Sequence, residues 1–219
     1  MTTQTRLEDT NLAALISSKI LHDLAGQIGA INNGLELLEE ENDEDTRYYA
    51  LELIQNSAKA AWAQLDFHRL AFGASSSLGA VVPLGHVEQV ARRYIENGKR
   101  RLHWQANLQD MDKENARMLL AVLSVALTSL PAGGDFYVAI QGSASKKQEP
   151  ARFKLAIVCR GRSARIQEGV AEIFAGKEAK VADTKLVVAY YASRLAAQAH
   201  YKISAAKDSE DAVYTIEPK

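Results

Sequence analysis

The sequence predicts an α+β protein in which an N-terminal antiparallel helical hairpin precedes a domain of helices packed on one face of a mixed sheet. Two long stretches repeat apolar residues every three or four positions, and the short acidic stretch 39–45 separates them. A run of small and polar residues, 73–79, is typical of a linker, and short β-type runs alternate with helical ones beyond it. The expected domains are therefore residues 1–76 and 77–219.

Composition is ordinary for a globular protein and disfavours several other classes. Of the 219 residues, 47% are hydrophobic and 24% are charged. The formal net charge of -1 gives no basic signal, so we expect no nucleic-acid partner. Cys159 is the single cysteine, which rules out an intrachain disulfide and favours the cytoplasm. Residues 1–11 are polar and no apolar run approaches the ~20 residues of a membrane span, so we expect neither a signal peptide nor membrane contact.

Each of the two long stretches predicts a helix with one apolar side. Thr10 or Asn11 can cap the first helix, which ends near Glu40. Asp45 or Thr46 caps the second, which ends near residue 72. The uncovered apolar side of such a hairpin is best buried by a second copy, which gives the four-helix bundle of a homodimer. The residues expected in that interface are Ile28, Ile31, Leu35, Leu51, Ile54 and Ala58.

The first helix also has a smooth strip beside its apolar stripe. The stripe consists of Ile16, Ile20, Leu24, Ile28, Ile31, Leu35 and Leu38. At about 100° per residue, His22 lies off this stripe. It is followed, at spacings of three or four, by Gly26, Gly29 and Asn33. On the second helix, the stretch level with His22 begins at the small residue Ala61. A glycine inside a helix costs roughly 1 kcal/mol relative to alanine, so we expect this strip to admit a closely approaching protein partner.

The chemistry that these residues indicate is phosphoryl transfer through a histidine. An exposed imidazole is a competent nucleophile near neutral pH. Asp23 follows His22 directly, and its short carboxylate can orient or polarise the ring. The alternative is a solvated His–Asp pair without a function. The glycine strip below His22 favours the functional interpretation.

The motif His22-Asp23-Leu24, together with Gly-Ala-Ile-Asn-Asn-Gly-Leu-Glu-Leu-Leu at 29–38, resembles the phosphoacceptor helix of the ChpT family of alphaproteobacterial histidine phosphotransferases. Leu-Pro-Ala-Gly-Gly at 130–134 also resembles that family and is shared with histidine kinases generally. The resemblance covers most of the chain. It implies a homodimeric relay that takes phosphoryl from the receiver domain of a hybrid histidine kinase and passes it to CtrA-like response regulators of the cell cycle. The partner receiver would supply the aspartate and Mg²⁺.

The second domain should contain four helices and five strands. The helices are expected at 83–97, 112–130, 163–174 and 184–199, the strands at 102–108, 136–141, 153–159, 201–206 and 212–216, and a polar loop at 142–150. This order resembles the Bergerat-type ATP-binding domain of histidine kinases.

The residues that such kinases use for nucleotide binding are missing. Aligned on the kinase pattern, Ala121 and Val125 replace the asparagines that hold Mg²⁺, and Thr128 replaces a common lysine. Cys159 replaces the adenine-reading aspartate, and a thiol is a poor acceptor for an exocyclic amine. The stretch 183–189, which includes Val188, lacks the phosphate-loop glycines. We therefore expect this chain to hold neither a nucleotide cofactor nor a metal ion.

Several alternatives remain open at this point. The second domain either only stabilises the hairpin or also docks a receiver, and Arg160, Arg162 and Arg165 form a basic cluster with no assigned role. The chain as a whole is a phosphotransferase, a non-catalytic degenerate kinase that binds receivers as a scaffold or inhibitor, or an ATP-dependent histidine kinase. The missing nucleotide residues argue against the last. The remaining histidines lack metal-ligand spacing; they are His68, His86, His103 and His200.

Overall fold

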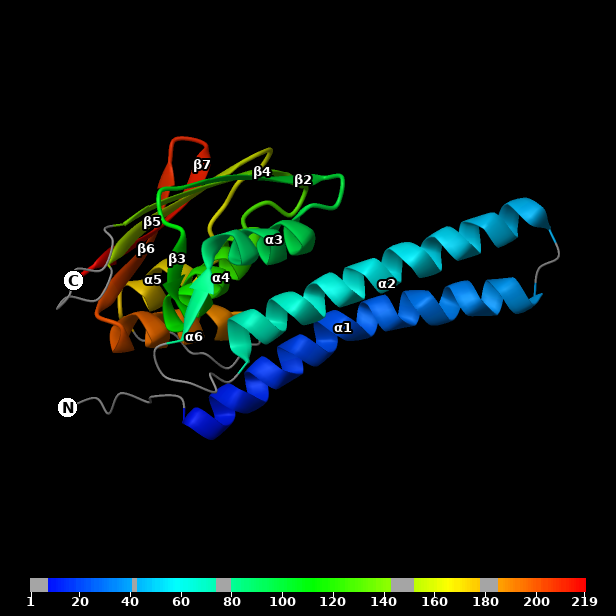
Figure 1. The fold of residues 1–219 in the computed structure, drawn as a ribbon, viewed down its shortest axis with the longest axis horizontal. Helices are drawn as coiled ribbons and strands as arrows, with labels where there is room; N and C mark the ends of the chain where they lie inside the picture. Colours follow the sequence, from blue (N-terminus) through cyan, green and yellow to red (C-terminus); the bar gives the residue numbers. More distant parts are fainter. Residues whose placement is uncertain (1–7, 41–42, 74–79, 143–151, 178–184) are drawn as a thin grey trace.

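The computed structural model describes residues 8–40, 43–73, 80–142, 152–177 and 185–219. Helices α1 (Asp9–Glu40) and α2 (Glu44–Phe72) form a long antiparallel hairpin, as predicted (Figure 1). The predicted cap of α2 is wrong by two or three positions. Asp43 is the N-cap, because its carboxylate accepts a 3.0 Å hydrogen bond from the backbone N–H of Thr46.

The rest of the chain forms a five-stranded mixed sheet with helices on one face, which confirms the predicted α+β class. In chain order, the elements of this part of the protein are β1 (Val81–Pro83), α3 (Leu84–Ile95), β2 (Arg100–Ala106), β3 (Asp110–Asp112), α4 (Lys113–Leu127), β4 (Gly134–Gly142), β5 (Phe153–Arg160), α5 (Val170–Phe174), α6 (Val187–Gln198), β6 (Tyr201–Asp208) and β7 (Asp211–Pro218). The strand order in the five-stranded sheet is β2-β4-β5-β7-β6, and β1 and β3 form a separate two-stranded sheet. Strands β2 and β4 are parallel, with Leu102 opposite Phe136, and the other neighbours are antiparallel.

Two features of this unit differ from the prediction. The helix expected over 163–174 is reduced to α5, because Ser163 and Gly169 adopt left-handed φ angles of 60° and 86° that interrupt a helix. Strands β1 and β3, which pair with each other, were not predicted, since three residues give no periodic signal. Most of the predicted polar loop 142–150 lies outside the described residues.

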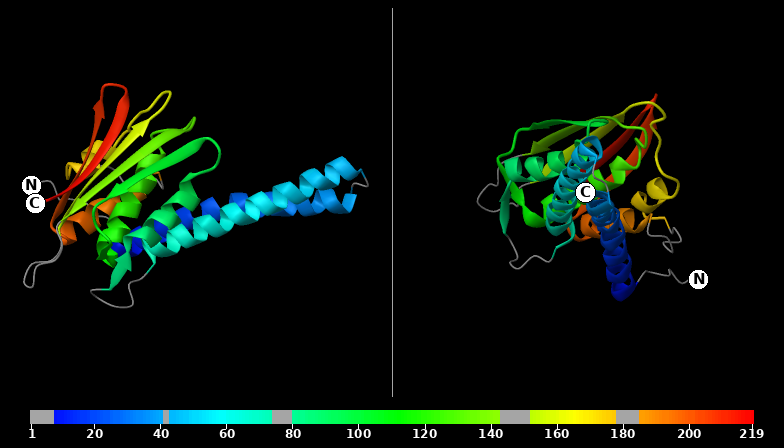
Figure 2. Two further views of the ribbon diagram at one scale, coloured as in Figure 1. Left: turned by 45° about the horizontal axis from the view of Figure 1, so that its top comes forward. Right: turned by 90° about the vertical axis from the view of Figure 1, so that its right-hand side faces the viewer.

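The helices lie between the sheet and the hairpin (Figure 2). Along β5 the side chains alternate, with Phe153, Leu155, Ile157 and Cys159 buried toward the helices. The last two turns of α2 enter the same core: Phe67 is fully buried, and its ring stacks on that of Tyr94 from α3 with centroids 4.0 Å apart. The hairpin is therefore anchored at its base by the core of the second unit.

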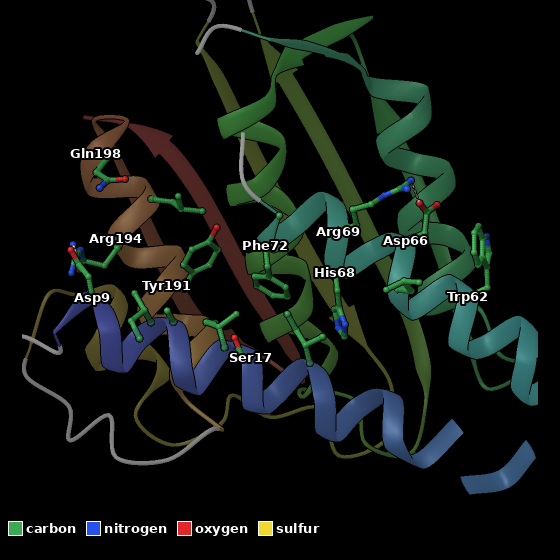
Figure 3. A pocket seen from close by; sticks show the side chains of 17 residues that line it. Asp9, Ser17, Trp62, Asp66, His68, Arg69, Phe72, Tyr191, Arg194 and Gln198 are labelled. Atoms are coloured by element: carbon green, nitrogen blue, oxygen red, sulfur yellow. Dashed lines mark hydrogen bonds and ion pairs between the residues drawn. The ribbon is translucent and has the colours of Figure 1, made fainter. Parts of the chain in front are cut away.

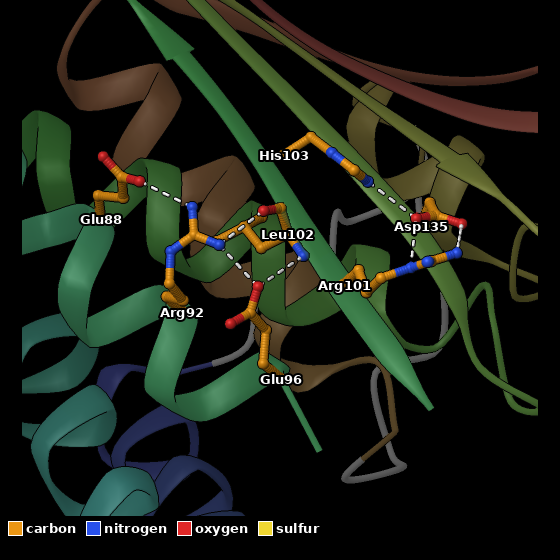
Figure 4. Close-up of polar contacts among 7 residues, drawn as sticks. All are labelled: Glu88, Arg92, Glu96, Arg101, Leu102, His103 and Asp135. Atoms are coloured by element: carbon orange, nitrogen blue, oxygen red, sulfur yellow. Dashed lines mark hydrogen bonds and ion pairs between the residues drawn. The ribbon is translucent and has the colours of Figure 1, made fainter. Parts of the chain in front are cut away.

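Arg92 fastens α3 to the edge strand β2 (Figure 4). Its guanidinium donates to the carbonyl of Leu102 at 2.8 Å and pairs with Glu88 and Glu96 on its own helix. Glu96 in turn accepts a hydrogen bond from the backbone N–H of Leu102. A neighbouring cluster joins β2 to β4, where hydrogen bonds from His103 and Arg101 lower the pKa of Asp135.

No helix within the described segments is long and apolar enough to cross a membrane.

The hairpin glycines differ in their surroundings. At Gly34 the two helices approach closely, since a Cβ there would lie 2.6 Å from Cγ1 of Ile54 and 3.1 Å from the carbonyl oxygen of Ala50. A Cβ at Gly26 or Gly29 would meet nothing within 4 Å. Gly34 is thus required for helix packing, whereas Gly26 and Gly29 are not.

This difference predicts opposite effects of the same substitution. Gly34→Ala should lower the free energy of unfolding by about 1–3 kcal/mol, because the added methyl overpacks the helix contact. Gly29→Ala should leave it unchanged or raise it by up to about 1 kcal/mol, because alanine is the better helix former. Urea denaturation followed by circular dichroism measures both. Equal effects of the two variants would contradict this account of the packing.

Candidate functional site

His22 projects into solvent from the middle of α1. Its side chain is 88% exposed, and it points away from the packed face of the helix. Its Nδ1 lies 3.7 Å from Oδ1 of Asp23, a contact that is longer than a hydrogen bond. The carboxylate near Nδ1 favours the tautomer with a proton on that nitrogen, in which Nε2 is unprotonated.

Asp23 is less exposed than His22 and joins the two helices of the hairpin. Its side chain is 17% exposed, and Nζ of Lys19, one turn earlier on α1, donates to Oδ1 at 2.6 Å. Its Oδ2 lies 3.7 Å from Nε2 of His68 on α2. The structure therefore brings together four residues, His22, Asp23, Lys19 and His68, of which the sequence predicted the first two.

His68 is an unusual residue for its position. It is only 4% exposed, and its Nδ1 has no hydrogen-bond partner within the described part of the chain. Its ring contacts those of Phe67, Phe72 and Tyr94. Burial lowers the pKa of its imidazole, and this outweighs the opposing effect of Asp23, so the ring is neutral at neutral pH. The sequence did hold a signal: His68 occupies the apolar spacing of three and four between Leu65 and Phe72.

The predicted docking strip is open. Gly26 and Asn33 are exposed and Gly29 is half-buried, with free space where either glycine would carry a Cβ. Ala61 is half-buried on α2. The α2 residue that reaches the site, His68, lies one turn beyond the stretch 61–65 that was expected to be level with His22.

The positions that would bind a nucleotide in a kinase are filled by core side chains. Ala121 and Cys159 are fully buried, and Val125 and Val188 are 5% exposed. Burial raises the pKa of the Cys159 thiol to about 12, so it remains protonated and inert. The described residues include no group of three or more His, Cys, Asp or Glu side chains arranged to hold a metal ion. Residues 183 and 184, at the start of the phosphate-loop position, lie outside the described residues.

A cavity of about 680 Å³ lies elsewhere, between α1, α2 and α6 at the base of the hairpin (Figure 3). Its wall is largely apolar and includes Ile16, Leu65 and Phe72, with Arg194 from α6 at its edge. His68 also lines it. None of the four filled nucleotide positions contributes to this cavity.

The predicted dimer face is only partly covered in the single chain. Ile28, Leu35 and Leu51 are 54%, 47% and 49% exposed. Ala58 is also exposed, and Ile31 and Ile54 are half-buried. Large apolar side chains gathered on one exposed face are typical of a protein interface.

The basic cluster is split between two environments. Arg160 pairs with Asp211 at 2.8 Å and lies over the Tyr137 ring, 5.4 Å from its centroid. Arg162 and Arg165 are exposed, and within the described segments neither side chain forms an ion pair. Two of the three arginines are thus free of an ion-pair partner in that part of the chain.

Comparison with known proteins identifies the family. The model described as histidine phosphotransferase C-terminal domain matches residues 84–211. Over 213 residues, the chain is 36% identical to the protein phosphotransferase ChpT of Brucella abortus (strain 2308), covering 96% of this chain and 97% of that protein. A solved structure of a bacterial phosphotransferase is 32% identical and superposes with a TM-score of 0.82, covering 99% of this chain and 100% of the other.

Membership of this family settles the class of activity. A phosphotransferase of a phosphorelay exchanges phosphoryl groups with receiver or response-regulator proteins, which are therefore the partners of this chain. The filled positions on α4 and β5 lie within the matched segment 84–211. The chain belongs to the histidine phosphotransferase family, and it is a protein phosphotransferase rather than an ATP-dependent kinase.

Proposed function

We propose that His22 is the phosphoacceptor of this phosphotransferase. It receives phosphoryl from the receiver aspartate of a hybrid histidine kinase and returns it to the aspartate of a response regulator. The observation that carries the proposal is the 88% exposed imidazole, whose Nδ1 lies near the Asp23 carboxylate while Nε2 has no hydrogen-bond partner among the described residues. An exposed, oriented nucleophile is what transfer between two proteins requires.

The transfer step needs little from this chain beyond that placement. Nε2 of His22 attacks the phosphorus of the receiver aspartyl-phosphate, the N–P bond forms, and the P–O bond to the receiver carboxylate breaks. The proton on Nδ1 is retained, so the ring becomes positively charged beside Asp23, which stabilises that charge. The return step reverses these bond changes. We expect Mg²⁺ to be held by the receiver, with no cofactor bound by this chain.

The proposed docking surface is the strip formed by Gly26, Gly29 and Asn33, with Ala61 on α2. The space above the two glycines supports it, because a receiver helix can approach α1 there without displacing a side chain. The acceptors that the resemblance implies are CtrA-like response regulators of the cell cycle. We propose that transfer to them takes place in the cytoplasm.

We also propose that the working form is a homodimer. The exposed Ile28, Leu35 and Leu51 on one face of the hairpin support this, since a second copy would remove them from water. Completing a four-helix bundle would bury mainly apolar surface, as in obligate dimers.

His22→Ala should abolish phosphoryl labelling of this chain by a phosphorylated receiver domain, because the variant lacks the proposed acceptor nitrogen. His86→Ala, which removes another exposed helical histidine, is the matched control and should be labelled like the wild type. Acid-labile label is measured on gels after mixing. Continued labelling of the His22→Ala variant would refute the assignment, and a wild type that binds receivers without acquiring label would favour the scaffold alternative.

Gly29→Leu should slow transfer in both directions while leaving the melting temperature nearly unchanged. The added side chain projects into open space on the free chain but blocks the approaching receiver, and a displacement of 1 Å can cost about a hundredfold in rate. Gly85→Leu is the control, because Gly85 on α3 is equally open but lies outside the proposed strip. Normal transfer by the Gly29→Leu variant would exclude this docking surface.

Light scattering at micromolar concentration should give a mass of about twice 24.0 kDa for the wild type. Leu51→Arg should shift the protein toward the monomer, because a charge would be buried in the apolar interface. Tyr49→Arg changes an exposed aromatic residue two positions away, off the predicted face, and should leave the dimer intact. A monomeric wild type would contradict the proposed assembly.

A further inference from the structure

We propose that His68, acting with Lys19, is a positioning residue that holds the Asp23 carboxylate beside His22 during phosphoryl transfer. This inference rests on the proposed role of His22. It assigns a function to a buried histidine on α2 that does not touch the reacting atoms.

The Asp23 carboxylate has contacts with side chains of both helices of the hairpin. Lys19 holds the carboxylate from α1, with Nζ 2.6 Å from Oδ1. His68 approaches from α2, with Nε2 3.7 Å from Oδ2. The carboxylate is confined between them, while Oδ1 remains 3.7 Å from Nδ1 of His22. Without both contacts, a short side chain that is partly open to water would sample other rotamers.

The surroundings of His68 favour a role for its polar atoms. The ring is packed among Phe67, Phe72 and Tyr94, where an apolar residue would fit without a desolvation cost. Its Nδ1 is buried and, within the described part of the chain, has no partner. The only charged side chain that its ring nitrogens approach there is Asp23. An apolar residue would pack at this position at least as well as the imidazole. We therefore attribute the presence of a histidine to its effect on the Asp23 carboxylate.

The protonation state of His68 determines how its ring interacts with the Asp23 carboxylate. The ring is neutral because burial lowers its pKa, and Tyr94 adds no charge because burial raises its pKa to about 12. A neutral imidazole carries one N–H. Within the described part of the chain, Nε2 lies near the Asp23 carboxylate and Nδ1 has no hydrogen-bond partner, so the proton belongs on Nε2. His68 thus directs an N–H dipole at Asp23 across 3.7 Å, a distance longer than a hydrogen bond, and it does not cancel the charge of the carboxylate. Lys19 supplies the opposite charge, and the carboxylate stays available to the imidazolium that forms on His22.

The test is the single-turnover rate of transfer from a saturating phosphorylated receiver domain to His22. His68→Phe should keep the melting temperature, since the pocket is aromatic, and should slow transfer about tenfold, because a loosely held carboxylate costs preorganisation. His68→Gln, whose side-chain amide can place an N–H near the position of Nε2, should restore most of the rate. Lys19→Met, at a partly exposed site, provides a second variant that does not depend on core packing.

The decisive comparison is made in an Asp23→Asn background. If His68 and Lys19 act through Asp23, His68→Phe and Lys19→Met should each change the rate of that variant by less than about twofold. Wild-type rates for both single variants, or equal slowing with and without Asp23, would overturn the inference while leaving His22 as the acceptor. Label on a residue other than His22 would instead overturn the proposed function, and the inference with it.

Discussion

The structure depends on the burial of the last turns of α2 in the core of the second unit. Phe67 and Ala71 are fully buried there, Phe67 stacks on Tyr94, and the hydroxyl of Tyr191 on α6 donates to the carbonyl of Ala71 at 3.3 Å. These contacts fix the base of the hairpin against α3, α4 and α6. Because α1 is packed along α2, they also determine where His22 is presented. The proposed phosphoacceptor, an exposed residue, is thus carried by a helix pair whose base is packed in a buried core.

The long elements could be predicted from the sequence because their periodicity extends over many residues. The hairpin, α4 and the sheet strands all show it, and each appears close to its expected place. Short-range details could not be predicted in the same way. Asp43 caps α2 instead of Asp45 or Thr46, because several acidic residues in a row offer equivalent caps and only the path of the chain selects one. The left-handed conformation of Ser163 was likewise not indicated by its residue type, because a positive φ is uncommon for a residue other than glycine.

The candidate site likewise contains residues that the sequence reveals and one that only the tertiary structure reveals. His22 and Asp23 are adjacent, so one local motif identifies both. His68 is 45 positions farther on than Asp23, and it becomes relevant only when the hairpin closes in the observed register. A position within an apolar spacing pattern is usually read as packing, and His68 does pack among aromatic rings. What the pattern could not show is that one edge of its ring faces a carboxylate on the opposite helix.

The buried side chains on α4 and β5 at the positions of a kinase nucleotide site bear on the direction of phosphoryl transfer. The buried Ala121 and Cys159 agree with the class of this chain, a protein phosphotransferase that is not an ATP-dependent kinase and so does not use ATP to phosphorylate itself. It is a catalyst of exchange, and a catalyst cannot alter the equilibrium between the proteins that it connects. Net flow therefore runs toward the transfer equilibrium between the two receiver pools, which depends on their phosphoryl occupancies and on the relative stabilities of their aspartyl phosphates. With His22 as the proposed carrier, draining one pool would send phosphoryl backward through the same histidine, and the occupancy of that histidine would report the balance between the pools.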